Sequence, residues 1–347
     1  MVKVGIINVT GYAGVELARF LSRHPDAEIV SVTGRSAAGQ KVSDVFPHLA
    51  GEVADMTITP EVTESVDVVF SALPQVESAK VCVPFVRNGT KVIDISADFR
   101  LHDPAVYQQW YKAEHPAPDL LETSVYGLTE LDREGIAGAD VVANPGCYPT
   151  GAILGLAPVV KAGLVKDQII VDAKSGVSGA GRGLSLGTHF SEVNENVYAY
   201  GIDGHRHLPE ITQELARQRD GFDPKVIFLP HLIPMTRGIL DSIYCDFVDG
   251  AFSGPEQAGK AIKELYRDFY KGERFVKVVN ASPQTKQTWG NNDCLIYPTV
   301  DKRTGRLMVF CALDNLVKGA AGQAIQNMNL MFGLPEAEGL DFIAIYP

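Results

Sequence analysis

Cys147 is the residue of this sequence best placed for nucleophilic chemistry. It lies in Asn-Pro-Gly-Cys-Tyr-Pro-Thr, residues 144–150, between a strand-like apolar run at 140–143 and a helix-like run at 150–162. At the start of a helix, unpaired N–H groups and the positive end of the helix dipole favour a thiolate. The same N–H groups would stabilise an oxyanion formed when the sulfur attacks a carbonyl carbon. The alternative is a small buried side chain in a turn, the usual role of a single cysteine.

Two histidines are candidates for the proton partner that such a nucleophile needs. His205 and His207 lie in Gly-His-Arg-His-Leu-Pro-Glu, residues 204–210, just before a predicted helix with a proline in its first turn. Histidine titrates near neutral pH, which suits acid–base catalysis. Ordinary surface or core histidines are the first alternative. A metal site is the second, although the sequence offers no obvious third ligand. The spacing does not decide which histidine moves the proton.

The first part of the chain alternates strand-like and helix-like segments. Apolar strands are expected at 2–9, 28–33, 67–74 and 91–96, with helices between them, which is typical of a doubly wound parallel sheet of the Rossmann type. Ligands bind at the carboxyl ends of such strands. We therefore expect one crevice to collect the residues that follow these ends, namely Leu73, Pro74, Arg100 and Cys147. Leu73 and Pro74 lie in a loop that is expected to face the cofactor.

The turn after the first strand is a candidate site for a pyrophosphate. Its glycines follow a spacing of G-x5-G-x2-G, which departs from the standard dinucleotide fingerprint, so an ordinary strand–turn–helix is the alternative. The second strand ends in Gly-Arg-Ser without the carboxylate that holds an NAD ribose. Arg35 and Ser36 thus favour NADP, the alternative being a solvated arginine. The predicted contacts in the turn are Thr10, Gly11, Tyr12, Ala13 and Gly14.

The rest of the chain has a different pattern. Apolar stretches recur at 226–233, 239–248 and 306–313, with one helix at 255–270, which indicates an α+β domain with a mainly antiparallel sheet. We expect residues 1–147 and 315–347 to form the dinucleotide-binding domain and 148–314 the substrate and oligomerisation domain. A helix rich in small residues is expected to begin at 314 and to bring Asn315 near the nicotinamide.

Composition narrows the class of partner. The 347 residues are 46% hydrophobic and carry a net charge of -11, which argues against nucleic acid and anionic membranes. No apolar run reaches the length of a membrane span, and no signal peptide is expected. The five cysteines form no C-x-x-C pair, which suggests reduced thiols in the cytoplasm without disulfide or zinc site. Cys82 has apolar neighbours in a predicted helix, and Cys245, Cys294 and Cys311 lie in or beside predicted strands, so all four are expected to be structural.

Taken together, these segments resemble the family of N-acetyl-gamma-glutamyl-phosphate reductases, which is related to the aspartate-semialdehyde dehydrogenases. The resemblance covers nearly the whole chain, and its most specific parts are the segments around Cys147 and the two histidines. A departure is Asn8-Val9, where the family more often has smaller residues. The matching segments are 10–14, 35–36, 96–100, 144–150, 175–181, 205–210, 234–238 and 314–319.

The resemblance implies reduction of N-acetyl-glutamyl phosphate, an acyl phosphate, to N-acetylglutamate semialdehyde by NADPH through a thioester on Cys147. It implies that His207 handles protons, with His205 as the runner-up. Arg100 resembles the phosphate-binding arginine of the aspartate-semialdehyde dehydrogenases, and Asn144 and Arg237 belong to matching segments and are taken as substrate-binding residues. A homodimer or homotetramer, no metal, and a small-molecule substrate complete the expectation.

Two other functions remain open on the sequence. A reductase of the same type could act on aspartyl phosphate or a carrier-bound aminoadipyl phosphate. A non-catalytic NADP-binding regulator could keep the fold, although an intact Cys147 with two candidate bases argues against it.

Overall fold

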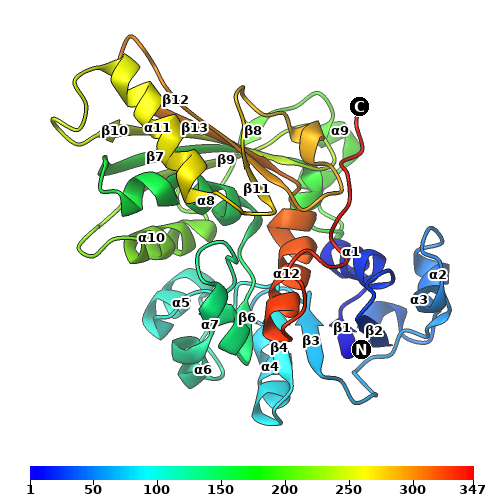
Figure 1. The fold of residues 1–347 in the computed structure, drawn as a ribbon. Helices are drawn as coiled ribbons and strands as arrows, with labels where there is room; N and C mark the ends of the chain where they lie inside the picture. The colour runs from blue at the N-terminus through cyan, green and yellow to red at the C-terminus, as the bar shows by residue number, and fades with distance from the viewer. The chain divides into compact units, whose positions relative to one another are not determined.

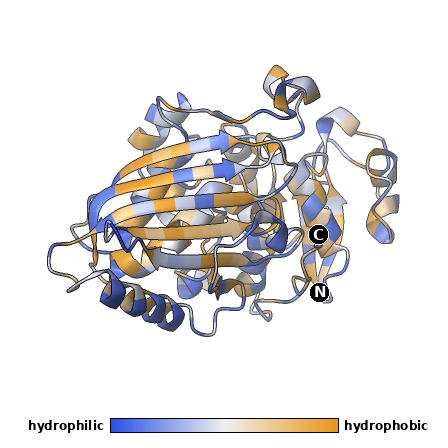
Figure 2. Ribbon diagram, turned by 90° about the horizontal axis from the view of Figure 1, so that it is seen from above, coloured by the Kyte–Doolittle hydropathy of each residue, from blue (hydrophilic) through white to orange (hydrophobic).

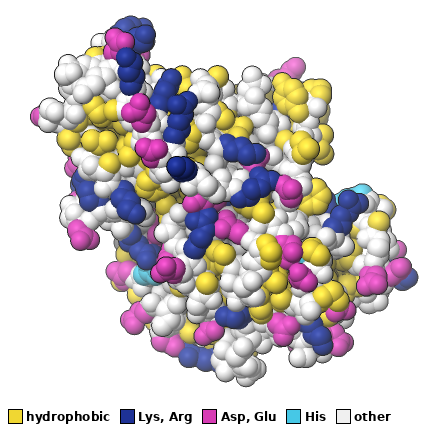
Figure 3. Space-filling view, in the orientation of Figure 1, with side chains coloured by type: hydrophobic (Ala, Val, Ile, Leu, Met, Phe, Trp, Pro, Cys, Tyr) yellow, Lys and Arg dark blue, Asp and Glu magenta, His cyan; other side chains and the backbone are white.

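The computed structural model describes all 347 residues, which fold into two compact units (Figure 1). Unit 1 comprises Met1–Gly146 and Ala320–Phe342, and unit 2 comprises Cys147–Gly319 and Ile343–Pro347. Positive and negative side chains are intermingled over the face seen in Figure 3. None of the helices has both the length and the apolar character needed to cross a membrane.

Unit 1 contains a six-stranded, entirely parallel sheet in the order β2-β1-β3-β4-β6-β5. The predicted doubly wound sheet is confirmed. Its strands are β1 (Val2–Ile7), β2 (Ala27–Val32), β3 (Val68–Ser71), β4 (Lys91–Asp94), β5 (Val125–Tyr126) and β6 (Val141–Ala143). Its helices are α1 (Tyr12–Leu21), a 3-10 turn (Arg35–Ala37), α2 (Val42–Val45), α3 (Glu52–Asp55), α4 (Ser78–Arg87), α5 (Pro104–Tyr111), α6 (Pro118–Thr123), α7 (Arg133–Gly138) and α12 (Gly322–Met331).

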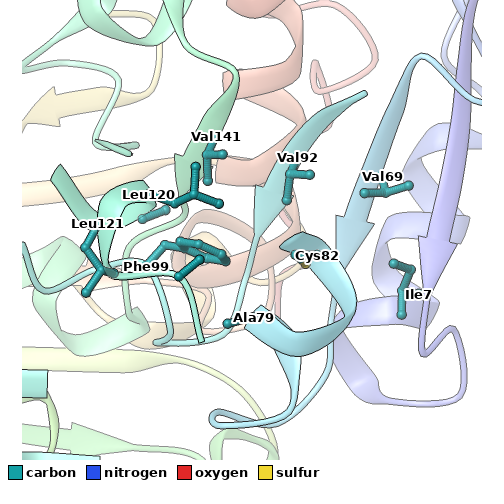
Figure 4. Packing of buried hydrophobic residues seen from close by; sticks show 11 residues of the cluster. Ile7, Val69, Ala79, Cys82, Val92, Phe99, Leu120, Leu121 and Val141 are labelled. Atoms are coloured by element: carbon teal, nitrogen blue, oxygen red, sulfur yellow. The ribbon is translucent and has the colours of Figure 1, made fainter. Parts of the chain in front are cut away.

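The core of unit 1 forms because both faces of the parallel sheet are covered, so its strands consist largely of buried β-branched and aromatic residues. Figure 4 shows one cluster of this core, to which Val69, Val92 and Val141 from three strands and Cys82 from α4 belong, with Leu120 and Leu121 near Phe99. Cys82 is fully buried, as predicted from its apolar neighbours.

Unit 2 contains a seven-stranded mixed sheet in the order β11-β12-β13-β10-β7-β9-β8. Four of its pairings are antiparallel, and β7–β9 and β11–β12 are parallel, so the predicted mainly antiparallel sheet is confirmed. Its strands are β7 (Val165–Ser175), β8 (Tyr198–Ala199), β9 (Lys225–Leu232), β10 (Ile239–Phe247), β11 (Val276–Val278), β12 (Cys294–Val300) and β13 (Leu307–Leu313). Its helices are α8 (Cys147–Lys161), α9 (Phe190–Val193), α10 (His207–Arg217) and α11 (Pro255–Phe269), with 3-10 turns at Val177–Ala180, Leu186–Thr188 and Thr285–Thr288.

One face of this sheet packs against α8, α10 and α11. A Cβ placed on Gly151 of α8 would overlap the buried Asp241 of β10, which shows that the odd-numbered residues of β10 face this helix. Cys245 and Cys311 are buried on the helix side, and Cys294 is also buried, as expected for structural cysteines.

The opposite face of the sheet carries a row of large side chains. Because side chains alternate along a strand, Tyr244 of β10 points away from α8. Its register partners are Ile170 on β7 and Met308 on β13, and Ile170 pairs in turn with Ile227 on β9. Ile227 is 62% exposed and Ile170 is 37% exposed. Figure 2 looks onto this sheet and shows hydrophobic residues along several of its strands.

The helix expected to begin at residue 314 begins later. Residues 314–316 are not helical, a π-helical turn spans Val317–Ala321, and α12 starts at Gly322. The side chains of Asp314 and Asn315 bind backbone N–H groups of neighbouring segments, and those bonds hold the chain in a non-helical conformation. The predicted first residue of the helix was therefore wrong, because these long-range partners cannot be inferred from the local pattern.

Candidate active site

Cys147 lies where the chain leaves β6 and enters α8. The strand ends at Ala143, the Pro-Gly turn follows, and Cys147 is the first residue of the helix. Its side chain is half-buried, whereas the other four cysteines are buried. Burial raises the pKa of the Cys245 thiol to about 12, and it raises the pKa of Cys82 and Cys311 as well. Cys147 is thus the thiol with access to solvent.

The two predicted histidines meet beside the residue that follows Cys147. The ring of Tyr148 packs edge-on against His205, at 6.1 Å between centroids, and against His207, at 5.9 Å. The centroids of the two imidazole rings are 4.8 Å apart. Phe228 of β9 closes the group, 5.4 Å from Tyr148. The structure therefore brings the cysteine segment and the histidine segment together within unit 2.

His205 has a perturbed pKa and a defined hydrogen bond. Burial, with a smaller effect of the Arg206 charge, lowers the pKa of His205 to about 4. The Nδ1 atom of His205 accepts a hydrogen bond of 3.1 Å from the backbone N–H of His207. His205 is therefore neutral at neutral pH, and its proton is assigned to Nε2.

A pair of tyrosines that the sequence interpretation missed completes the cluster. The hydroxyl oxygens of Tyr148 and Tyr200 are 3.1 Å apart. Burial raises the pKa of Tyr200 to about 12, and the Cys147 sulfur adds a smaller contribution in the same direction. Burial also raises the pKa of Tyr148, so both tyrosines remain O–H donors at neutral pH. Tyr148 could have been found from its position next to Cys147, but nothing local marks Tyr200 or Phe228.

The segment 314–319 lies behind the nucleophile. A Cβ on Gly319 would approach the Cβ of Cys147 to 2.8 Å, so only glycine fits there without displacement. The buried carboxylate of Asp314 accepts hydrogen bonds from Arg237 Nε, at 3.0 Å, and from the Gly290 N–H, at 2.8 Å. Arg237, a predicted substrate residue, is partly exposed and is held by this ion pair.

Asn315, predicted to contact the nicotinamide, is 2% exposed in the structure. Its Oδ1 accepts from the Gly238 N–H at 2.7 Å, and its Nδ2 donates to Ser178 Oγ at 2.9 Å. These bonds lie inside unit 2 and fix the loop that follows Arg237.

Arg100 and Asn144, predicted to bind substrate, are both buried in unit 1. The guanidinium of Arg100 donates to the carbonyl oxygens of Asn144 and Ile95, each at 2.8 Å. The Asn144 side chain donates to the Ala320 carbonyl and accepts from Asn327. These contacts fix the end of β6, three residues before Cys147.

The glycine turn of unit 1 has the features of an anion site. Gly11 is the N-cap residue of α1 and provides no side-chain cap, and the first turn carries no acidic residue. A Cβ on Gly14 would lie 2.3 Å from the Asn8 carbonyl oxygen, so glycine is required for this close crossing of strand and helix. Thr10 Oγ1 donates to Asn8 Oδ1, while Tyr12 and Ala13 are half-buried at the start of α1.

The two neighbouring strand ends carry the other predicted cofactor residues. Arg35 and Ser36 are exposed directly after β2. Leu73 is half-buried and Pro74 exposed after β3. Lys80, and more weakly Arg35, lower the pKa of Glu77 in the connection that follows β3.

Comparison with known proteins identifies both units. Residues 3–139 match the family model described as semialdehyde dehydrogenase, NAD binding domain, and residues 147–315 match the model described as semialdehyde dehydrogenase, dimerisation domain. An N-acetyl-gamma-glutamyl-phosphate reductase of Dehalococcoides mccartyi is 55% identical over 345 residues, covering 99% of each chain. One from Pelotomaculum thermopropionicum is 53% identical, covering 100% of this chain and 99% of the relative.

Solved structures of lower similarity share the fold. Aspartate semialdehyde dehydrogenase with NADP from Candida albicans superimposes with a TM-score of 0.71 at 17% identity, covering 96% of this chain and 98% of the other. The aspartate semialdehyde dehydrogenase II of Vibrio cholerae, complexed with ASA, gives a TM-score of 0.68 at 15% identity over 96% and 98% of the two chains.

Proposed function

The chain belongs to the family of N-acetyl-gamma-glutamyl-phosphate reductases, and we propose that it reduces N-acetyl-L-glutamyl 5-phosphate to N-acetyl-L-glutamate 5-semialdehyde and phosphate with NADPH, in arginine biosynthesis. The observation that carries the proposal is the cluster of a half-buried cysteine at a helix start with two histidines and two tyrosine hydroxyls. A non-catalytic regulator has no use for such a constellation.

The residues of unit 1 fit a dinucleotide with a 2′-phosphate. The uncapped N-terminus of α1 offers N–H groups to a pyrophosphate through the segment 10–14. The exposed Arg35 and Ser36 follow β2 without a neighbouring carboxylate on that turn, and they suit a phosphate rather than a free ribose hydroxyl. NADPH, when bound, supplies the hydride.

Cys147 provides covalent catalysis in this proposal. The thiolate attacks the acyl carbon, the bond from that carbon to the phosphate oxygen breaks, and phosphate leaves with the electron pair. The thioester formed on Cys147 accepts a hydride where a carboxylate does not. The carbon–sulfur bond of the resulting hemithioacetal then breaks, which releases the aldehyde and restores the thiolate.

The histidines and tyrosines divide the remaining work. We assign proton transfer to His207, and a neutral, positioning role to His205, in keeping with its lowered pKa and its bond to the His207 backbone. The hydroxyls of Tyr148 and Tyr200 are bonded to each other, so one of them can donate elsewhere. We assign stabilisation of the oxyanion of the tetrahedral intermediates to the Tyr200 O–H, with the buried Tyr148 orienting it.

Substrate recognition is assigned to Arg237, which is partly exposed and held in place by Asp314. A guanidinium fork matches the oxygens of a carboxylate or phosphate. Arg100 and Asn144 act on the substrate through the chain segment that they fix ahead of Cys147. Asn315 fixes the loop of Arg237.

We further propose that the protein is a homodimer. In this dimer the face of the seven-stranded sheet that points away from α8, here called the open face, packs against the same face of a second subunit. The row of Ile227, Ile170, Tyr244 and Met308 provides an apolar, self-complementary surface. The enzyme is placed in the cytoplasm, where free thiols stay reduced.

The direct test is the phosphate-dependent oxidation of N-acetylglutamate semialdehyde with NADP, followed by the appearance of NADPH. Aspartate semialdehyde serves as the comparison substrate, since it has a shorter chain than N-acetylglutamate semialdehyde and lacks the acetyl group. The proposal expects a kcat/KM that favours the N-acetylated substrate by orders of magnitude. A preference for aspartate semialdehyde, or turnover without added phosphate, would reject it.

A further inference from the structure

Val76 adopts a backbone conformation that valine rarely takes. Its φ is +74°, in the left-handed region, where a β-branched residue is a true outlier. Val76 belongs to the connection 72–77 between β3 and α4, which also contains Leu73 and Pro74, two of the predicted cofactor-binding residues. Strained residues persist where the surroundings hold them, and they concentrate at ligand sites.

Asp98 is the side chain that holds this connection. Its Oδ1 accepts a hydrogen bond of 2.7 Å from the Val76 N–H, and its Oδ2 accepts one of 2.9 Å from the Ala79 N–H in the first turn of α4. The carboxyl group thus binds the chain on both sides of the turn into the helix, and it satisfies N–H groups that have no partner within α4. Asp98 is fully buried, so water does not compete for these bonds.

Asp98 is itself held by two further hydrogen bonds. Tyr107 Oη donates to its Oδ1 at 2.9 Å, and its backbone N–H donates to Ser96 Oγ at 3.1 Å. Figure 4 shows that Ala79 and Phe99 belong to one hydrophobic cluster. Asp98 and the two N–H groups that it binds are therefore held by the core of unit 1.

The start of the connection is tied to the glycine turn. Asn8, which also has a positive φ of 66°, donates from Nδ2 to the Ala72 carbonyl at 2.8 Å. Ile7 at the end of β1 is the register partner of Ser71 at the end of β3. The two left-handed residues therefore lie just beyond the carboxyl ends of neighbouring parallel strands, where dinucleotides bind.

We propose that Asp98 is a positioning residue for the cofactor, which holds the connection 72–77 in a strained conformation ready to receive NADPH. The identity of the cofactor rests on the proposed function. A connection that is already ordered needs no ordering when the cofactor binds, which raises affinity.

The test compares Asp98→Asn with Tyr107→Phe. Asparagine keeps one acceptor oxygen but turns an amide toward a backbone N–H, so one of the two bonds to the connection is lost. Tyr107→Phe removes the third bond to the same carboxyl group and leaves both bonds to the connection. Asp98→Asn should weaken NADPH binding about tenfold or more, while Tyr107→Phe should stay within about threefold of wild type. Binding is measured by fluorescence titration without substrate.

Two further readouts separate positioning from general destabilisation. Amide exchange at Val76 and Ala79, measured without cofactor, should become faster in Asp98→Asn and stay slow in Tyr107→Phe. Val76→Gly removes the strain, because glycine adopts a positive φ readily. The double variant Asp98→Asn/Val76→Gly should therefore regain most of the NADPH affinity, and it keeps the test open if Asp98→Asn alone is unfolded.

Unchanged NADPH affinity in folded Asp98→Asn, equal losses in both single variants, or no recovery in the double variant would each overturn the role of Asp98. Wild-type protein that does not bind NADPH at all would instead overturn the proposed function, and this role with it.

Discussion

Single residues in this structure are distinguished by their surroundings rather than by their types. Five cysteines are present, but four are buried and one begins a helix. Two histidines stand two positions apart, yet burial lowers the pKa of one to about 4. The sequence predicted the important residue types and their segments, because helix starts and glycine turns have local signals. It could not predict Tyr200 or Phe228, which reach the cluster only through the pairing of β8 with β9.

Replacing Arg35 with alanine should selectively weaken NADP binding. A charge-assisted bond to the 2′-phosphate contributes on the order of 1.5–3 kcal/mol, so NADP affinity should fall roughly tenfold or more while NAD affinity changes little. Both dissociation constants are measured by titration. Equal weakening of NAD and NADP would show that Arg35 has only a structural effect.

Replacing His207 with asparagine should lower turnover by about 10²–10⁴-fold, the range expected for loss of a general acid or base. His205→Asn should act mainly on KM, because His205 is already neutral at neutral pH. Rates of both variants are compared from pH 6 to 9. If His205→Asn flattens the pH profile and His207→Asn leaves it intact, the two roles are reversed.

At the scale of elements, local patterns predicted most strands and helices, and failed where side chains from distant segments fix the backbone. The run from residue 314 has the composition of a helix start, but Asp314 and Asn315 keep residues 314–316 non-helical through bonds to Gly290 and Gly238. The left-handed Val76 is a similar case, since its partner Asp98 lies 22 residues away. Such conformations depend on tertiary contacts that no local window contains.

Asp94, the last residue of β4, should make the free energy of unfolding depend on pH. Burial, with the nearby Asp98, raises the pKa of Asp94 to about 6 from an ordinary value of 3.8. The folded state therefore binds this proton more tightly, and the contribution of Asp94 to stability is full below pH 4 and lost as pH rises through 6. Relative to Asp94→Asn, wild type should lose up to about 3 kcal/mol between pH 4 and 7. Urea unfolding of both proteins at each pH measures this difference in the free energy of unfolding. A difference that stays constant across this range would contradict the raised pKa.

At the scale of the molecule, the two units carry different parts of the proposed chemistry. The glycine turn, Arg35 and the β3–α4 connection belong to unit 1, and Cys147 with its histidines belongs to unit 2. Alternating strands and helices identified the first unit from sequence, and the change to long apolar strands identified the second. The sequence did not reveal the open face of the second sheet, because its row of apolar side chains depends on the register of four strands.

If that face forms the dimer interface, a charged side chain introduced on it should weaken the dimer. Ile170→Lys and Ile227→Lys should each shift the protein toward monomer in sedimentation velocity, because a buried lysine without a partner is costly at an apolar interface. Ile343→Lys, at a residue 93% exposed in the C-terminal tail, is the matched control and should leave the assembly unchanged. An assembly that tolerates both sheet variants would place the interface elsewhere.

The covalent role of Cys147 is tested most directly by a single turnover without phosphate. Enzyme is mixed with NADP and excess N-acetylglutamate semialdehyde, NADPH is followed by absorbance, and the protein is analysed by intact and peptide mass. We predict a burst of about one NADPH per subunit, an acyl adduct on the peptide that contains Cys147, and release of the adduct when phosphate is added. Cys147→Ser should bind NADP normally and give neither burst nor adduct. Steady NADPH formation by Cys147→Ser, or an adduct on another residue, would contradict the mechanism.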